Sequence, residues 1–91
     1  MANLSGYVMS QKLVNEKVVV TAMGFRKNLA VYPKRIEFQG KTYSFIDAGL
    51  RCLIRSGSLI AEIITLSDGE SNYRLRRDGT TLGWTLLSIA S

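Results

Sequence analysis

The chain has 91 residues and a formal net charge of +5, with 12 basic and 7 acidic side chains, one cysteine and no histidine. This length suits one small domain, and a lone cysteine excludes the internal disulfide framework of many small secreted domains. No apolar run approaches the roughly 18 residues of a membrane helix. We therefore expect a single cytoplasmic domain over residues 1–91, with no membrane partner.

The N-terminal region has no clear hydrophobic period. Three consecutive β-branched residues, Val18, Val19 and Val20, favour a strand over Val18–Met23. The preceding residues 1–16 fit neither a helix nor a strand well. We interpret them as an N-terminal arm, either flexible or partly helical.

Four glycine-containing dipeptides separate the apolar runs in the rest of the chain. Glycine tolerates the positive φ that tight hairpin turns require. The four predicted turns are Gln39-Gly40, Ser56-Gly57, Asp68-Gly69 and Asp78-Gly79.

Pairing outward from Gln39-Gly40 sorts the side chains into an apolar and a polar face. The apolar face carries Ile36, Phe38, Tyr43 and Phe45, and the polar face carries Arg35, Glu37, Thr42 and Ser44. A slip of one residue would exchange the two faces, so this sorting supports the register.

The next predicted turn, Ser56-Gly57, sets Ile54 opposite Leu59 and Arg51 opposite Glu62. The second of these is a pair of opposite charges, which favours the pairing. The sequence therefore predicts an ion pair between these two strands.

The two Asp-Gly turns differ in clarity. A two-residue turn at Asp78-Gly79 pairs Tyr73 with Trp84. A two-residue turn at Asp68-Gly69 puts the charged Glu62 opposite an apolar residue, so we expect a bulge or a longer loop there. That register remains open.

Together these segments predict an all-β fold, a small antiparallel meander of about six to seven strands. So short a meander must curl into a barrel or a two-layer roll to hide its faces and edges. In size and hairpin count it matches SH3-like and Sm-like barrels, an architecture that many unrelated functions share. The run Leu59–Leu66 is apolar on both faces apart from Glu62 and Thr65, which is typical of a central covered strand or of a strand facing a partner.

The sequence offers little catalytic chemistry. It lacks histidine, the commonest general base and zinc ligand, and its lone thiol at Cys52 has no histidine to activate it. The carboxylates show no catalytic spacing, and no phosphate-binding glycine loop is present. We expect no enzyme activity, no cofactor and no metal.

The positive charge is concentrated in the first half of the chain. Residues 1–45 hold seven basic and two acidic side chains, whereas residues 46–91 hold five of each. Basic groups interleaved with aromatic rings are typical of proteins that bind single-stranded nucleic acid. The candidate nucleic-acid-binding residues are Arg26, Lys27, Tyr32, Lys34, Arg35 and Lys41, with a secondary basic cluster at Arg74, Arg76 and Arg77.

Two functional interpretations follow. In the first, a non-enzymatic module binds single-stranded RNA or DNA through its basic half. In the second, the module binds a protein partner or assembles with itself, because 46% apolar content is rich for so short a chain.

Overall fold

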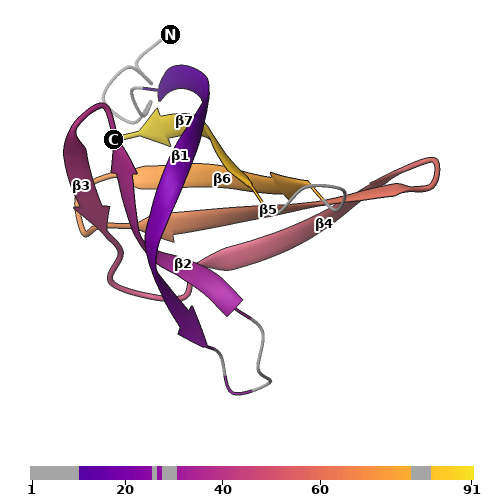
Figure 1. Cartoon of the computed structure of the whole chain (residues 1–91), viewed down its shortest axis with the longest axis horizontal. Helices are drawn as coiled ribbons and strands as arrows, with labels where there is room; N and C mark the ends of the chain where they lie inside the picture. The colour runs from indigo at the N-terminus through magenta and orange to yellow at the C-terminus, as the bar shows by residue number, and fades with distance from the viewer. Residues whose placement is uncertain (1–10, 26, 28–30, 79–82) are drawn as a thin grey trace, which may run out of the picture.

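The computed structural model describes residues 11–25, 27, 31–78 and 83–91. These form a single antiparallel sheet of seven strands in the order β3-β2-β1-β7-β6-β5-β4. The predictions of an all-β antiparallel fold and of about seven strands are confirmed, but the strands do not form one continuous meander, because β1 pairs with β7 while β3 and β4 lie at opposite edges. Figure 1 shows its strands, which are β1 (Gln11–Phe25), β2 (Val31–Phe38), β3 (Lys41–Ser44), β4 (Leu50–Ser56), β5 (Leu59–Ser67), β6 (Asn72–Asp78) and β7 (Trp84–Ala90).

The long strand β1 is shared between the two halves of the sheet. Its first part, up to Val18, pairs with β7, and its second part, from Val19, pairs with β2. A register shift accompanies the positive φ of 54° at Asn15, as expected for a bulge that bends the strand. The prediction of a flexible or partly helical arm is thus wrong for residues 11–16, which are strand, and residues 1–10 lie outside the described residues.

The core lies on the inner, concave face of the curved sheet. Strands that are not neighbours meet there, since the ring of Tyr73 on β6 lies 5.4 Å from that of Tyr43 on β3 and 5.3 Å from that of Phe45. The buried apolar side chains are Ile36, Phe38, Phe45, Ile64, Leu66, Tyr73, Leu75, Trp84 and Leu86. The sheet therefore folds over its own hydrophobic face.

The sheet nevertheless keeps two edges, because β3 and β4 do not pair with one another. The segment between them contacts both halves of the molecule. The backbone N–H of Phe45 donates to the carbonyl of Lys34 (3.0 Å), and that of Ile46 donates to the carbonyl of Ser67 (2.8 Å). The strands thus form an open curved sheet rather than a closed barrel.

The β2–β3 hairpin has the predicted register. Ile36 faces Tyr43, and Phe38 faces Lys41 across a two-residue turn. Both turn residues have positive φ, 52° at Gln39 and 76° at Gly40, which is the backbone twist that joins two antiparallel strands most readily.

The β4–β5 hairpin departs from the predicted register. Its turn residues are Gly57 and Ser58 rather than Ser56 and Gly57, so Ile54 faces Ala61 instead of Leu59. The reason is that Gly57, with φ of 62°, occupies the first turn position. The predicted ion pair of Arg51 with Glu62 does form, diagonally across the two strands.

The β5–β6 connection is a longer loop, one of the two alternatives that the sequence left open. Four residues separate the last pair, Ser67 and Asn72, and Asp68 organises them. Its Oδ1 accepts the backbone N–H groups of Glu70 (2.9 Å) and Ser71 (2.8 Å). The longer loop moves Glu62 from an apolar neighbour to Arg77.

The predicted register of β6 and β7 is wrong. Tyr73 faces Ile89 rather than Trp84, and Trp84 faces Arg77. The connection is therefore longer than a two-residue turn at Asp78-Gly79. Residues 79–82 lie outside the described residues.

Candidate functional site

The predicted nucleic-acid-binding cations lie along one strand rather than in one cluster. Lys34 and Arg35 are exposed in the middle of β2, Lys27 lies in the turn before it, and Lys41 opens β3 after it. Eight residues of strand span roughly 25 Å, so Lys27 and Lys41 lie at opposite ends of β2. Arg26, the remaining predicted cation, lies outside the described residues.

Tyr32, the aromatic residue in this predicted site, is half-buried and packs against the core. It faces Gly24 on β1, and a Cβ atom on that glycine would overlap the tyrosine ring. The ring thus covers a glycine of the neighbouring strand. Phe25, at the end of β1, is 70% exposed and is better placed to stack on a base.

Arg35 is tied to the neighbouring strand. Its Nε donates a hydrogen bond to Thr21 Oγ1 (3.0 Å), and that hydroxyl donates to the Arg35 carbonyl (3.3 Å). These contacts hold the arginine beside β1 on the exposed face of the sheet.

The secondary basic cluster is divided between the two faces of the sheet. Successive strand residues point to opposite faces, so Arg76 lies on the outer face and Arg77 on the inner face. On the outer face, Arg76 and Lys17 flank Thr85 from the two neighbouring strands. No local pattern in the sequence signals this row, because it depends on the long-range pairing of β1 with β7.

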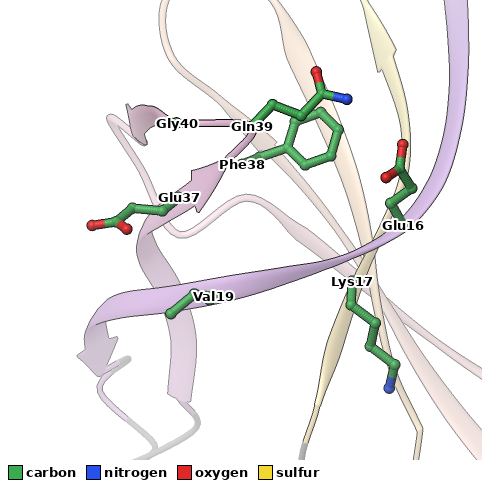
Figure 2. Close-up of a pocket in the computed structure, with 7 residues that line it drawn as sticks. All are labelled: Glu16, Lys17, Val19, Glu37, Phe38, Gln39 and Gly40. Carbon is green, nitrogen blue, oxygen red and sulfur yellow. The ribbon is translucent and has the colours of Figure 1, made fainter.

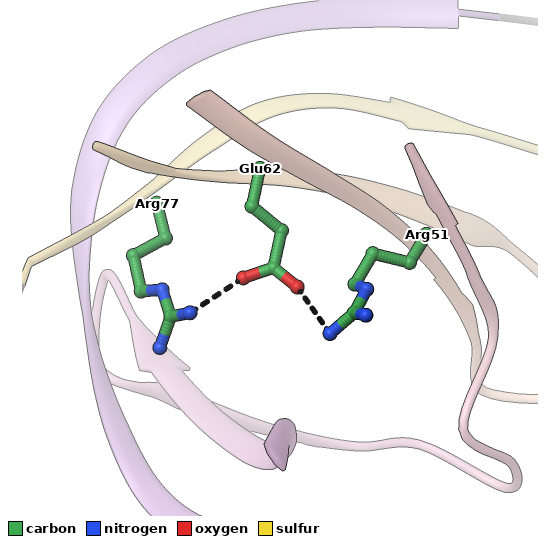
Figure 3. Close-up of polar contacts among 3 residues, drawn as sticks. All are labelled: Arg51, Glu62 and Arg77. Carbon is green, nitrogen blue, oxygen red and sulfur yellow. Dashed lines mark ion pairs between the residues drawn. The ribbon is translucent and has the colours of Figure 1, made fainter. Parts of the chain in front are cut away.

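On the inner face, Arg77 and Arg51 hold a buried carboxylate between them (Figure 3). Glu62 is only 5% exposed, and its oxygens lie 3.1 Å from Arg51 Nη1 and 2.8 Å from Arg77 Nη2. The Arg77 guanidinium also lies 5.5 Å from the centre of the Trp84 ring. These contacts compensate the charge of Glu62 where water is largely excluded.

Beyond this ion-paired group, the β4–β5 hairpin presents apolar side chains to solvent on both of its faces. Figure 1 shows this hairpin reaching out beyond the rest of the sheet. Alternation places Leu53 and Ile60 on the inner face, while the outer face carries the others. Five large side chains are between 44% and 80% exposed, namely Leu50, Leu53, Ile54, Leu59 and Ile60.

Of the two interpretations of Leu59–Leu66, this exposure contradicts the central strand covered along its whole length, and the strand facing a partner stays a prediction. Only its second part is covered, since Ile64 and Leu66 are buried in the core. β5 is the second strand from the sheet edge, and β4 beside it leaves both faces of the hairpin open near the turn.

The backbone of β4 is also available for pairing. Ser56 and Leu59 close the two-residue turn and therefore exchange hydrogen bonds, after which bonded and non-bonded pairs alternate. The amide and carbonyl groups of Arg51, Leu53 and Arg55 consequently point away from β5. The Cys52 thiol donates to the Leu53 carbonyl (3.9 Å), but none of the described strands pairs with this edge, so β4 combines exposed apolar side chains with a backbone edge that can accept a further strand.

Among the described residues, two of the surface hollows are shallow and lie beside charged side chains. One lies between β1 and the tip of the β2–β3 hairpin, where Glu16 and Lys17 project to opposite sides of β1 and Glu37 points away from Phe38 (Figure 2). The other is lined by Leu53 and Ile60 together with the ion-paired Glu62 and its two arginines. The charged groups of the first hollow do not converge on one point.

Within the described ranges, no three His, Cys, Asp or Glu side chains gather into a group that could hold a metal ion. That part of the chain also contains no helix of the length and hydropathy needed to span a membrane. Comparisons with known protein families, with curated proteins and with solved structures gave no match.

Proposed function

We propose that the protein is a non-enzymatic assembly module, which joins chains by adding a strand to the free edge of β4. The supporting observation is the coincidence on one hairpin of five exposed apolar side chains and a backbone edge with which no other described strand pairs. Burying one such side chain contributes about 1.5–3 kcal/mol, and edge pairing supplies the directional hydrogen bonds. The single cysteine is consistent with the cytoplasm as its compartment.

The ion-paired group supports the same proposal. Glu62 fixes Arg51 on β4 and Arg77 on β6 to the strand between them, so the base of the hairpin is held in place. A strand that is ordered before it binds loses less conformational entropy on pairing. The exposed hairpin is therefore suited to act as a template.

The experiment is light scattering over a wide concentration range with the variant Leu53→Pro. Proline removes the outward-pointing N–H of residue 53 and leaves the hydrogen bonds between β4 and β5 intact. The wild type should form oligomers and the variant should be monomeric. A wild-type protein that stays monomeric at the highest concentrations would contradict the proposal.

The matched control is Thr42→Pro on the opposite edge. Thr42 faces Glu37 in the β2–β3 hairpin, one position from the pair that closes the turn, so its N–H likewise points outward. This variant should assemble like the wild type. Loss of assembly in both variants would show that the effect is not specific to β4.

A second candidate function is the binding of single-stranded nucleic acid along β2. The observation that favours it is the line of exposed cations from Lys27 through Lys34 to Lys41, with Phe25 exposed near one end. Fluorescence anisotropy with short RNA and DNA at about 50 mM salt tests it, because phosphate contacts are strong at low salt.

In that assay Lys34→Glu should weaken binding, whereas Lys12→Glu should weaken it less. Lys12 is an exposed lysine in the part of β1 that pairs with β7, so the two variants change the net charge equally. Equal effects would indicate non-specific attraction to a basic protein, and no binding by the wild type would exclude this function.

A further inference from the structure

We infer that the strand added to β4 is β4 of a second copy, paired antiparallel about a two-fold axis at Cys52. This inference rests on the proposed assembly function and specifies its partner and register. It follows from the hydrogen-bonding pattern of the edge and from the positions of two arginines.

The backbone pattern leaves a small set of symmetric registers. The outward-pointing groups belong to Arg51, Leu53 and Arg55, and in an antiparallel ladder residues with such groups must face one another. A symmetric pair of β4 strands is then centred on a residue rather than between two residues. Within the middle of the strand, the possible centres are Arg51, Cys52, Leu53 and Ile54.

Like charges disfavour two of these registers. A pair centred on Arg51 sets that arginine opposite its own copy, and a pair centred on Leu53 sets Arg51 opposite the second copy's Arg55. Like charges directly opposite one another destabilise a strand pair. The centres at Cys52 and Ile54 avoid both contacts.

The pairing of apolar side chains decides between the remaining two. Centred on Cys52, the exposed Leu50 faces the second copy's Ile54 on the outer face, and this contact occurs twice by symmetry. On the inner face Leu53 lies opposite Arg51, whose aliphatic stem can cover it while Glu62 holds the guanidinium. Centred on Ile54, the pair would leave Leu50, the most exposed of these side chains, without a partner residue.

The inferred register brings the two thiols together. Cys52 exchanges hydrogen bonds with Ile63 on β5, so across the new interface it forms a non-hydrogen-bonded pair with its copy. The Cα atoms of such a pair are about 4.5 Å apart, within the range of about 4.4–6.8 Å that a disulfide requires. Cys52 is exposed in the single chain and can therefore report on the register.

The experiment is disulfide trapping of the native protein with diamide, which takes up the two hydrogen atoms lost by the thiols as one S–S bond forms. The wild type should give a covalent dimer that a reducing agent reverses. The variant C52S/I54C should trap at least about tenfold more slowly, because its introduced thiol at position 54 faces residue 50 of the other copy. The variant C52S/T42C provides an exposed thiol on the β3 edge and measures trapping by random collision.

Trapping rates are compared between variants that light scattering shows to assemble equally, because Ile54 itself lies in the inferred pair. Fast trapping at Cys52 with slow trapping at positions 54 and 42 supports the register. Fast trapping at position 54, or trapping at Cys52 no faster than at position 42, overturns it, while oligomers in light scattering would leave the assembly function standing. A strictly monomeric protein would overturn both.

Discussion

The two edges of this sheet are built differently. β3 has four residues, its central Tyr43 packs against Tyr73, and the backbone that follows it is hydrogen-bonded to both halves of the molecule. β4 has seven residues, and all those whose exposure is described, from Leu50 to Arg55, are exposed. β-Proteins usually blunt their edges with short strands, charges or covering segments. One edge here follows that rule and the other does not, which is why we assign assembly to β4.

The largest effect should come from placing a charge on the apolar edge. Ile54→Lys puts a lysine where the inferred pair buries two copies of a side chain that is 44% exposed in the single chain, so about 1–3 kcal/mol of burial is lost and two like charges enter the interface. The dissociation constant should rise at least about 100-fold in analytical ultracentrifugation. Thr42→Lys makes a comparable change on β3 and should leave the constant within about twofold. Similar effects at the two positions would remove the distinction between the edges.

The next effect concerns the ion-paired group beneath β4. Replacing both arginines, in Arg51→Met/Arg77→Met, leaves the buried Glu62 carboxylate without a compensating charge. Removing the partners of a buried charge typically costs about 3–5 kcal/mol, and we expect the unfolding free energy to fall by about 3 kcal/mol. Urea denaturation in the Leu53→Pro background, which we expect to be monomeric, measures this loss. The control is Lys34→Met, which replaces an exposed cation and should change the unfolding free energy little. An equally small change in the double arginine variant would contradict the expectation.

A smaller effect on stability is expected from alanine substitutions in the turns of the two edge hairpins, β2–β3 and β4–β5. Gly40 and Gly57 both have positive φ, and nothing in the described structure lies within 4 Å of a Cβ atom at either. Replacement by alanine therefore introduces only backbone strain, of about 1 kcal/mol. Gly40→Ala should lower the global unfolding free energy by about this amount, because its hairpin contributes Phe38 to the core. Gly57→Ala should instead accelerate amide exchange within β4 and β5, as expected for local opening.

The smallest effect is a dependence on pH at the loop that supports the β3 side. The Tyr73 hydroxyl donates a hydrogen bond to Asp68 Oδ2 (2.7 Å), and this bond, with backbone N–H donors, lowers the pKa of Asp68 below its ordinary value of 3.8. A carboxyl group whose pKa is lowered on folding stabilises the protein above its unfolded pKa, and this contribution is lost as the pH falls through the lowered value.

Tyr73→Phe removes that donor and should make stability less sensitive to pH below about pH 4. Burial and the same hydrogen bond raise the pKa of Tyr73 itself, so its own contribution is present at neutral pH and is lost as the pH rises past about 10. Thermal unfolding of the wild type and the variant, measured from below pH 4 to above pH 10, tests both the acidic and the alkaline loss of stability. Parallel profiles would contradict the role of the bond.

The local parts of the fold were predictable from the sequence, and the long-range parts were not. The predicted register of the Gln39-Gly40 hairpin was correct, because only that register separates its apolar side chains from its polar ones. The sequence does not show whether a glycine takes the first or the second position of a two-residue turn. The Gly57-Ser58 turn was therefore predicted one residue too early. The pairing of β1 with β7, which carries no local signal, accounts for the missed length of β1.

In the candidate site, too, the local features were predictable from the sequence and the long-range contacts were not. The exposure of Lys34 and Arg35 agrees with their polar surroundings in the sequence. The packing of Tyr32 on Gly24 depends on the register of β1 and β2, and could not be foreseen. For the β4–β5 hairpin the sequence left two interpretations of Leu59–Leu66 open, because an apolar strand is typical both of a core and of a surface that faces a partner.

The shared strand β1 has a consequence for the order of folding. Its neighbour β7 lies at the far end of the strand sequence, so the contact of Lys17 with Thr85 closes a loop of nearly the whole described chain. Hairpins form within microseconds, whereas contacts at such separation come late and slow the reaction. During synthesis, β4 and β5 leave the ribosome before β7 and can pair with one another first. We therefore expect nascent chains to expose the β4 edge before their own sheet is complete, so that association can begin between partly folded molecules.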